Sequence, residues 1–338
     1  MAIKIKDVAE YAGVSVGSVS SYLNGKELKP ANMQKIKEAI EVLNYKPNTI
    51  AQSLKSRKSM SVGILIDSLT DQFAASIVEI AQSILIAHGY TVLLCSFSMD
   101  VKKQEQKLMY LLDKKVDGAI LYLSGDYLPT LEEFTKQNKP LVLINEDIKD
   151  LYADKILVNN SEAGFRATEK LIQAGHKNIA IVLGARDDYT GVGRLDGYKK
   201  ALKYYGLEPN EDLIMYAKYD FKIAYEMVKK ILESENPPTA IFATSYHLTI
   251  GAVIAINELD LKIPTDISII GFDHFELSDV IKPQITLVEQ PIEQIGVLAA
   301  ETLLKRLSGD LSSPPKRIEL NTNICARNSI ANIRESEE

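Results

Sequence analysis

Two charged side chains stand where a parallel sheet would present them to a ligand. Asp273 directly follows the apolar run Ile267–Phe272, and Arg194 begins a stretch with helical spacing. If the run is a strand, Asp273 emerges at its carboxyl end, where open α/β sheets bind small molecules. A carboxylate accepts hydroxyl hydrogen bonds, and a planar guanidinium suits vicinal hydroxyls or a carboxylate. The two residues therefore predict recognition of a polar small molecule; a helix cap and a surface ion pair are the alternatives.

The motifs of common enzyme classes are absent from the sequence. Gly191-Val192-Gly193 begins like a dinucleotide-binding loop, but Asp196 stands at the third glycine position. There is no Walker loop and no GxSxG sequence, and the four histidines and two cysteines lack metal-ligand spacing. We therefore predict no enzymatic activity, no cofactor and no metal.

The first 60 residues suggest a nucleic-acid partner. They hold ten basic and five acidic residues, a net charge of +5, whereas residues 61–338 hold 29 basic and 40 acidic residues, a net charge of −11. The total of −6 thus hides a basic module joined to an acidic body. A lysine-rich solvated face is the alternative interpretation.

The pattern within this basic segment predicts three helices. Apolar residues recur at helical spacing up to Ala12, and Gly13 and Ser15 can end one helix and cap the next. A second helix is expected over Val16–Asn24 and a third from Pro30 to about Asn44. Two short helices joined by a glycine-containing turn are typical of the helix-turn-helix unit, whose second helix enters the major groove. An ordinary three-helix bundle is the alternative.

From Ser61 onward, apolar strands and helical segments alternate in two series, starting near Val62 and Ile179. Near-continuous apolar strands imply parallel sheets covered on both faces. The predicted fold class is therefore α/β, with an N-terminal helix-turn-helix head followed by two doubly wound lobes. Small ligands bind such lobes in the cleft at the carboxyl ends of the strands.

Several runs of the sequence resemble the lac-repressor (LacI/GalR) family. Residues 4–15 (KIKDVAEYAGVS), 43–48 (LNYKPN) and 51–54 (AQSL) match its head and hinge, and residues 194–198 (RLDGY) and 266–273 (DISIIGFD) match its body. The resemblance runs through the whole chain. It implies a DNA-binding transcription regulator with a periplasmic-binding-protein-like body that binds a carbohydrate-like effector. We expect this regulator to be a repressor.

The resemblance divides the chain into three parts. It implies a DNA-binding domain at 1–46, a hinge helix at 47–60 and an effector-binding and dimerisation domain at 61–338. Within the body, the first lobe is expected over about 61–159 and 290–319, and the second over about 160–289 and 320–332.

The resemblance also assigns DNA contacts. Ser21 stands where the family usually has arginine, so the base readout is expected to differ. The hinge helix is too short to be stable alone, and Leu54 matches the leucine that wedges into the minor groove; a plain interdomain linker is the alternative. The predicted DNA-binding residues are Lys6, Ser15, Val16, Gly17, Ser18, Ser21, Asn24, Asn48, Ala51, Gln52, Leu54 and Lys55.

In the body, the resemblance implies effector contacts at five positions. They are Phe73, Arg194, Phe221, Ser245 and Asp273. Core packing is the alternative for Phe221. Ser245-Tyr246 replaces the usual Asn-Asp pair, and His274 replaces a second aspartate. The cleft therefore keeps the arginine and aspartate anchors while its walls differ, so a sugar or sugar derivative is expected and its identity stays open.

The expected partners are a palindromic double-stranded DNA operator, a small-molecule effector and a second copy of the chain, with no membrane. No run approaches the roughly 18 apolar residues of a membrane span, and the N-terminal residues have no apolar signal core, so we expect a cytosolic protein. Two alternatives stay open. One is a regulator that answers to a phosphoprotein partner, and the other is a solute-binding protein with no role on DNA.

Overall fold

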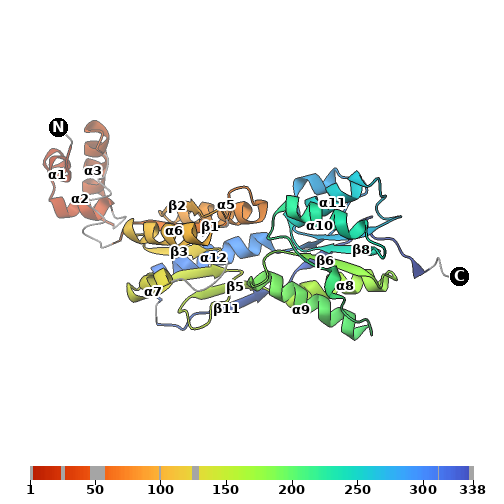
Figure 1. Ribbon diagram of the computed structural model, residues 1–338. Helices are drawn as coiled ribbons and strands as arrows, with labels where there is room; N and C mark the ends of the chain where they lie inside the picture. Colours follow the sequence, from red (N-terminus) through yellow and green to blue (C-terminus); the bar gives the residue numbers. More distant parts are fainter. Residues whose placement is uncertain are drawn as a thin grey trace. The chain divides into compact units, whose positions relative to one another are not determined.

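The computed structural model describes residues 3–23, 27–45, 58–98, 100–123, 129–310 and 312–334. The chain forms two compact units, Met1–Met60 and Ser61–Glu338, whose elements are labelled in Figure 1. In the part of the chain so described, no helix combines the length and the apolar character that crossing a bilayer requires.

The head consists of helices α1 (Ile5–Ala12), α2 (Val16–Leu23) and α3 (Pro30–Val42). Gly13 takes the left-handed conformation (φ 62°) that ends α1, and the Ser15 hydroxyl accepts a hydrogen bond from the Ser18 amide at 3.0 Å, which caps α2. The buried side chains of Val8, Val19 and Ile36 join the three helices in one small core. The third helix ends slightly before the predicted Asn44, which itself adopts a positive φ of 46°.

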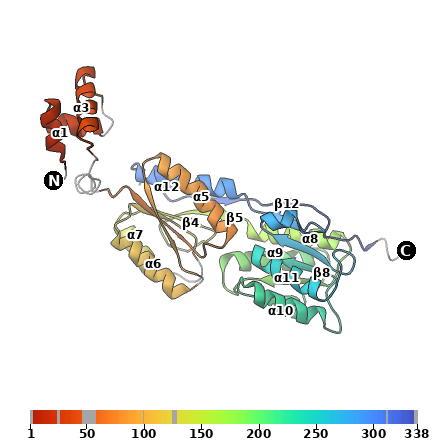
Figure 2. The ribbon, with the colours of Figure 1, turned by 90° about the horizontal axis from the view of Figure 1, so that it is seen from above.

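The first lobe of the body is a six-stranded parallel sheet in the order β11-β5-β4-β3-β1-β2. Helices α5 and α12 cover one face and α6 and α7 the other (Figure 2). Its strands are β1 (Ser61–Ile66), β2 (Thr91–Ser96), β3 (Gly118–Leu121), β4 (Leu141–Ile144), β5 (Asp154–Val158) and β11 (Arg317–Leu320), and its helices are α5 (Gln72–Ala87), α6 (Val101–Asp113), α7 (Pro129–Lys136) and α12 (Ile292–Leu307).

The second lobe repeats this plan with the order β12-β10-β9-β8-β6-β7, in which only the β10–β12 pair is antiparallel among the described strands. Helices α8 and α9 pack together on one face, and α10 and α11 on the other. Its strands are β6 (Ile179–Leu183), β7 (Ile214–Tyr216), β8 (Ala240–Ala243), β9 (Ser268–Phe272), β10 (Thr286–Glu289) and β12 (Asn323–Cys325), and its helices are α8 (Asn160–Gln173), α9 (Tyr189–Tyr204), α10 (Phe221–Leu232) and α11 (Tyr246–Glu258), with short 3-10 turns at Glu211–Leu213 and Glu276–Asp279.

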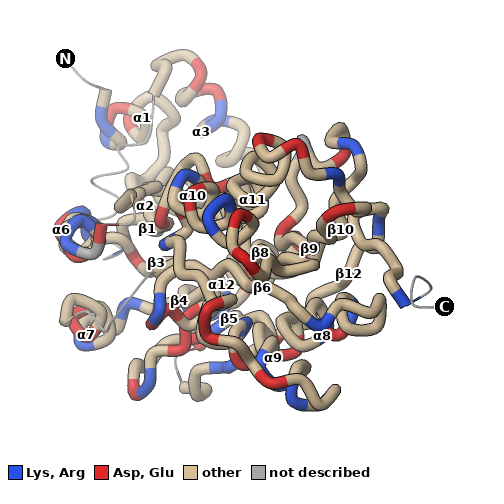
Figure 3. Tube along the Cα trace, turned by 45° about the vertical axis from the view of Figure 1, so that its right-hand side comes forward, with Lys and Arg blue, Asp and Glu red and all other residues tan. Residues whose placement is uncertain are grey.

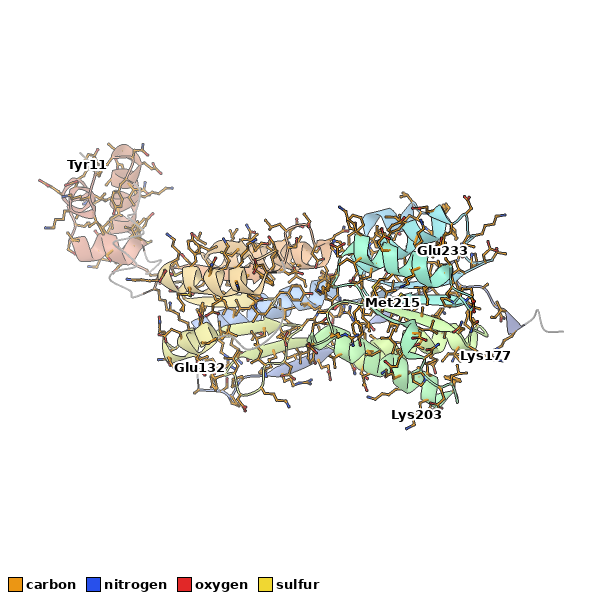
Figure 4. The ribbon with its side chains drawn as sticks, in the orientation of Figure 1. Tyr11, Glu132, Lys177, Lys203, Met215 and Glu233 are labelled. Atoms are coloured by element: carbon orange, nitrogen blue, oxygen red, sulfur yellow. The ribbon has the colours of Figure 1, made fainter. Side chains whose placement is uncertain are left out.

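The chain passes between the two lobes three times: after β5, after β10 and after β11. Because α12 and β11 belong to the first lobe while β10 and β12 belong to the second, neither lobe is a continuous stretch of sequence. Buried residues such as Met215 fill the lobe cores, while Lys177 and Lys203 lie at the rim of the second lobe (Figure 4). Charges of both signs are spread along the helices of the body (Figure 3).

Candidate functional site

A cavity of about 170 Å³ lies between the two lobes, where the strands of both sheets end. The first lobe contributes Asp67, Ser68, Thr70, Asp71, Phe73, Tyr122, Leu123, Asn145 and Glu146. The second lobe contributes Asp188, Tyr189, Thr190, Arg194, Tyr219, Ser245, Tyr246, His247 and Asp273, and Gln290 comes from the second crossing. The wall is therefore built from carboxylates and aromatic rings with a single guanidinium.

Arg194 is 3% exposed, and its side chain is held from three sides. Nε donates to the Asn160 side chain at 2.9 Å and Nη1 donates to the Thr244 carbonyl, while the guanidinium stacks 3.7 Å from the centre of the Phe272 ring. The guanidinium is thus fixed before any ligand arrives, as a preorganised recognition group requires.

A close crossing of α8 and α9 positions this arginine. A Cβ atom on Gly164 would lie 2.2 Å from the Arg194 carbonyl oxygen, and one on Gly197 would lie 2.0 Å from the Ser161 carbonyl oxygen. Both distances are impossible for real atoms, so the helices approach this closely only because both residues are glycine. Gly197 thus lies where the two helices cross, and this close crossing positions the Arg194 side chain three residues earlier in α9.

Asp273 follows β9 in a left-handed conformation (φ 67°) and points into the same cavity. Its Oδ1 accepts a hydrogen bond from Gln290 Nε2 at 2.7 Å. Gln290 Oε1 accepts in turn from Asn145 Nδ2 at 3.1 Å, and Asn145 Oδ1 accepts from the Val158 amide at 3.1 Å. These buried side chains form a chain of hydrogen bonds, which we call the relay. It runs from Asp273 in the cavity through Gln290, where the chain passes from β10 back to the first lobe, to the end of β5, where the chain first leaves that lobe.

Phe221 is the predicted effector residue that the structure does not place in the cavity. It is 40% exposed in the first turn of α10 and is not among the residues that line the cavity. Tyr219 occupies the wall instead, and its hydroxyl contacts Thr190 and Asp188 at 2.8 and 2.9 Å. A Cβ on Gly184 would lie 2.0 Å from this ring, so that glycine allows the tyrosine to turn inward and leaves Phe221 outside. Phe73, Arg194, Ser245 and Asp273 all line the cavity.

Burial changes the protonation of several of these groups. It raises the pKa of Asp67 to about 6 and the pKa values of Asp71 and Glu146 to about 7. Burial also raises the pKa of Asp273, although the Arg194 charge opposes that effect. The pKa of the His247 imidazole is lowered by burial, so the ring is neutral at pH 7.

Among the described residues of the head, Lys6 lies on α1, and the other predicted DNA contacts lie on α2 or at its N-terminus. Lys6, Ser15, Val16 and Gly17 are exposed, and Ser18 and Ser21 are half-buried. Ser15 and Ser18 also contact each other through their hydroxyls at 2.9 Å. On α1, Tyr11 is exposed as well (Figure 4). The other predicted DNA contacts lie outside the described residues: Asn24, Asn48, Ala51, Gln52, Leu54 and Lys55.

Sequence reasoning missed much of the cavity wall, including Asp67, Asn145, Glu146, Asp188 and Gln290. A positional signal was available, because Asp67, Asn145 and Gln290 each follow directly on a strand, as Asp273 does. The carboxyl ends of parallel strands meet at one edge of a sheet, so every polar residue at such an end is a candidate. Over the described ranges, no three His, Cys, Asp or Glu side chains are arranged to hold a metal ion.

A helix-turn-helix head followed by a two-lobed body with a cleft between the lobes defines a class of ligand-controlled DNA-binding proteins. Two family models match parts of the chain. Residues 4–48 match the model of bacterial regulatory proteins of the lacI family, and residues 168–330 match a periplasmic binding protein-like domain.

Curated relatives match along nearly the whole chain. The HTH-type transcriptional repressor PurR of Vibrio atlanticus (strain LGP32) is 32% identical over 97% of this chain and 99% of its own length. Catabolite control protein A of Priestia megaterium is 33% identical over 94% of this chain and 98% of its own length. The chain belongs to the lacI family of bacterial regulatory proteins, which confirms the family predicted from the sequence motifs.

Solved structures confirm the predicted fold class. The transcriptional regulator CelR in complex with cellobiose superposes with a TM-score of 0.74 at 27% identity, over 97% of this chain and 99% of that chain. The lac repressor dimer bound to operator and the anti-inducer ONPF gives a TM-score of 0.85 at 24% identity, over 98% of this chain and 100% of that chain, a likeness of fold.

Proposed function

We propose that this protein is a transcriptional repressor that binds a palindromic operator as a homodimer and is controlled by a small carbohydrate-like effector. The observation that carries the proposal is the cavity between the lobes, in which a buried arginine and a buried aspartate stand fixed beside hydroxyl-bearing and aromatic side chains. Relatives named as repressors, and a similar regulator solved with cellobiose, support both halves of it.

The proposed control works through the angle between the lobes. A ligand that contacts Arg194 and Asp273 in the second lobe and Phe73 in the first holds the two lobes at one angle. The first lobe begins at Ser61, directly after the hinge segment 47–60, so a change of that angle alters the separation of the two hinges in a dimer. Allosteric coupling of about 1–3 kcal/mol would change operator affinity about 5–150-fold.

Operator binding is tested with the full chain. Selection from a library of palindromic DNA fragments, followed by fluorescence anisotropy over a range of salt concentrations, should yield a fragment that is bound with steep salt dependence. Absence of sequence-specific, salt-sensitive binding would contradict the proposal and favour a solute-binding protein.

An apolar surface on the first lobe supports the homodimer. Leu69 (62% exposed), Ile86 (54%) and Leu94 (39%) surround one shallow groove whose floor includes Val78. Exposed apolar side chains gathered in one patch are typical of protein interfaces. We therefore assign this surface to a second copy of the chain.

Replacing Ile86 with lysine should shift the dimer toward monomer in analytical ultracentrifugation, because a charge would be buried against apolar side chains. Met109→Lys is the matched control, since Met109 is equally exposed (54%) but lies on α6, which covers the other face of the sheet. A dimer that is equally stable in the parent and in the Ile86 variant would remove this surface from the interface.

A further inference from the structure

The helix that enters the DNA groove carries neither a charged nor an amide side chain. In a helix-turn-helix unit the second helix lies in the major groove, and its N-terminal residues contact the base edges. In this head that helix is α2, with the sequence VGSVSSYL. Arginine or lysine reads guanine through two hydrogen bonds, and asparagine or glutamine reads adenine in the same way. Because α2, described along its whole length, has none of these four residue types, it makes neither bidentate contact.

The core of the head takes up part of α2. Val19 is fully buried, and Tyr22 and Leu23 are half-buried against the same core. The Ser18 hydroxyl lies 2.9 Å from the Ser15 hydroxyl, so these two side chains contact each other at the helix N-terminus. The remaining positions of the helix are Val16, Gly17, Ser20 and Ser21.

Val16 leaves an apolar side chain on this surface. It is the first residue of α2 and is 41% exposed, whereas Val8 and Val19 are fully buried. The core of the head thus does not enclose the Val16 isopropyl group. Among the base edges of the major groove, thymine alone carries a methyl group, at C5, and apolar side chains contact it. Contact between the isopropyl group and this methyl group would remove apolar surface of both from water.

Gly17 makes room for a close approach beside Val16. In the described part of the head, a Cβ atom at Gly17 would meet only the Ser15 hydroxyl oxygen, at 3.6 Å, which is an ordinary contact. The fold of the head therefore accepts a side chain at this position, and alanine would favour the helix more than glycine does. Glycine is typical of places where the backbone comes close to a ligand. The start of α2 can thus lie directly against the base edges.

We infer that α2 recognises a thymine in each operator half-site by its C5-methyl group, with Val16 as the residue that contacts the methyl. This contact takes the place of a bidentate hydrogen bond to guanine. The inference rests on the proposed function, since it specifies the base that the same head reads. The hydroxyls of Ser20 and Ser21 can bond to more than one kind of base, so the apolar contact carries the base selectivity of this surface.

Base analogues test the methyl group directly. Deoxyuridine keeps every hydrogen-bonding group of thymidine and lacks only the C5-methyl. In the selected operator, each thymine is replaced in turn in both half-sites, and binding of the full chain is measured by fluorescence anisotropy. At one symmetric position, the replacement should weaken binding about fourfold per half-site, or about 15-fold for the pair. At that position, a 5-methylcytosine–guanine pair should bind more tightly than a cytosine–guanine pair, because it restores the methyl group.

Variants assign the methyl contact to Val16. Val16→Ser removes the apolar branches at a surface position, so the variant should stay folded and bind the thymine and deoxyuridine operators equally well. Val16→Thr keeps one methyl group and should retain a weaker preference for thymine. Val42→Ser is the matched control, because Val42 is the last residue of α3 and is 58% exposed; it should keep the full preference. Circular dichroism of each variant checks that the helices are intact.

Three results would overturn the inference: deoxyuridine without effect at every thymine, a deoxyuridine effect of the same size in Val16→Ser, or selected half-sites in which no position requires thymine. Each of these results is obtained with a specific operator, so the proposed function would stand. If no specific operator can be selected, the proposed function itself is refuted, and the inference with it.

Discussion

The relay from Asp273 through Gln290 to Asn145 can be broken by one substitution. Gln290→Leu replaces the amide side chain with an apolar side chain of comparable volume. It deprives the Asp273 carboxylate of its 2.7 Å hydrogen bond and leaves Asn145 Nδ2 without its acceptor at 3.1 Å. Both affected groups are buried, at 7% and 3% exposure, so solvent replaces the lost partners poorly.

The magnitude follows from these two bonds. A hydrogen bond to a charged group contributes about 1.5–3 kcal/mol, and an unsatisfied buried donor costs about 1–3 kcal/mol. Because Asp273 also faces the cavity, where water can enter, we expect a loss of about 2–3 kcal/mol in the free energy of unfolding. For a body of this size, that loss corresponds to a fall of roughly 3–5 °C in melting temperature.

Urea unfolding and differential scanning calorimetry measure this effect. Gln173→Leu is the matched control, because Gln173 is exposed and bonds only the Tyr205 hydroxyl at 3.2 Å; its change should stay within about 0.5 kcal/mol. The Gln290 variant should also respond less to effector, because Asp273 loses the group that orients it. A stability loss equal to that of the Gln173 variant would refute the relay as a structural connection between the cavity and the crossings.

Three further predictions concern the cavity. Arg194→Ala should abolish the effector response while specific operator binding persists. Arg186→Ala, at an exposed position outside the cavity, should leave the effector response and operator binding unchanged. An effector response in the Arg194 variant would remove that residue from the site. Gly197→Ala forces α8 and α9 apart, so it should weaken effector binding and lower the free energy of unfolding by about 1–3 kcal/mol. Effector titration measures the first effect and urea unfolding the second. An unchanged effector affinity would mean that the helix crossing does not position Arg194. Burial raises the pKa of Glu146 to about 7, the negative charges of Asp188 and Asp147 raise it further and the charge of Lys155 lowers it, so the folded chain keeps a proton that the unfolded chain releases above about pH 4. The stability that this group contributes is therefore fully present below about pH 4 and falls as pH rises toward 7. Glu146→Gln should be more stable than the parent at pH 8, by about 1–2 kcal/mol for this half-buried group, and should lose that advantage at pH 5. The same difference in the free energy of unfolding at both pH values, measured with urea, would contradict this prediction.

Local patterns account for what was predictable in the head and in the strands. The glycine that ends α1, the serine that caps α2 and the proline at the start of α3 act within a few residues of their own positions, so their roles can be inferred without tertiary structure. The apolar runs that became β6, β8 and β9 are buried on both faces, and such runs are recognisable by composition alone. Arg194 and Asp273 were found because each lies in a motif that the family shares.

The sequence by itself determined the fold class, the family and the position of the basic segment, because these depend on periodicity, capping residues and ordered motifs. Only the tertiary structure decided which side chains meet in the cavity. Glu146 and Asp188 lie in different lobes, and Gln290 becomes part of the site because the chain crosses between the lobes three times. Tyr219 rather than Phe221 lines the wall because Gly184 leaves space for its ring. Such contacts join residues far apart in the chain, and no local pattern encodes them.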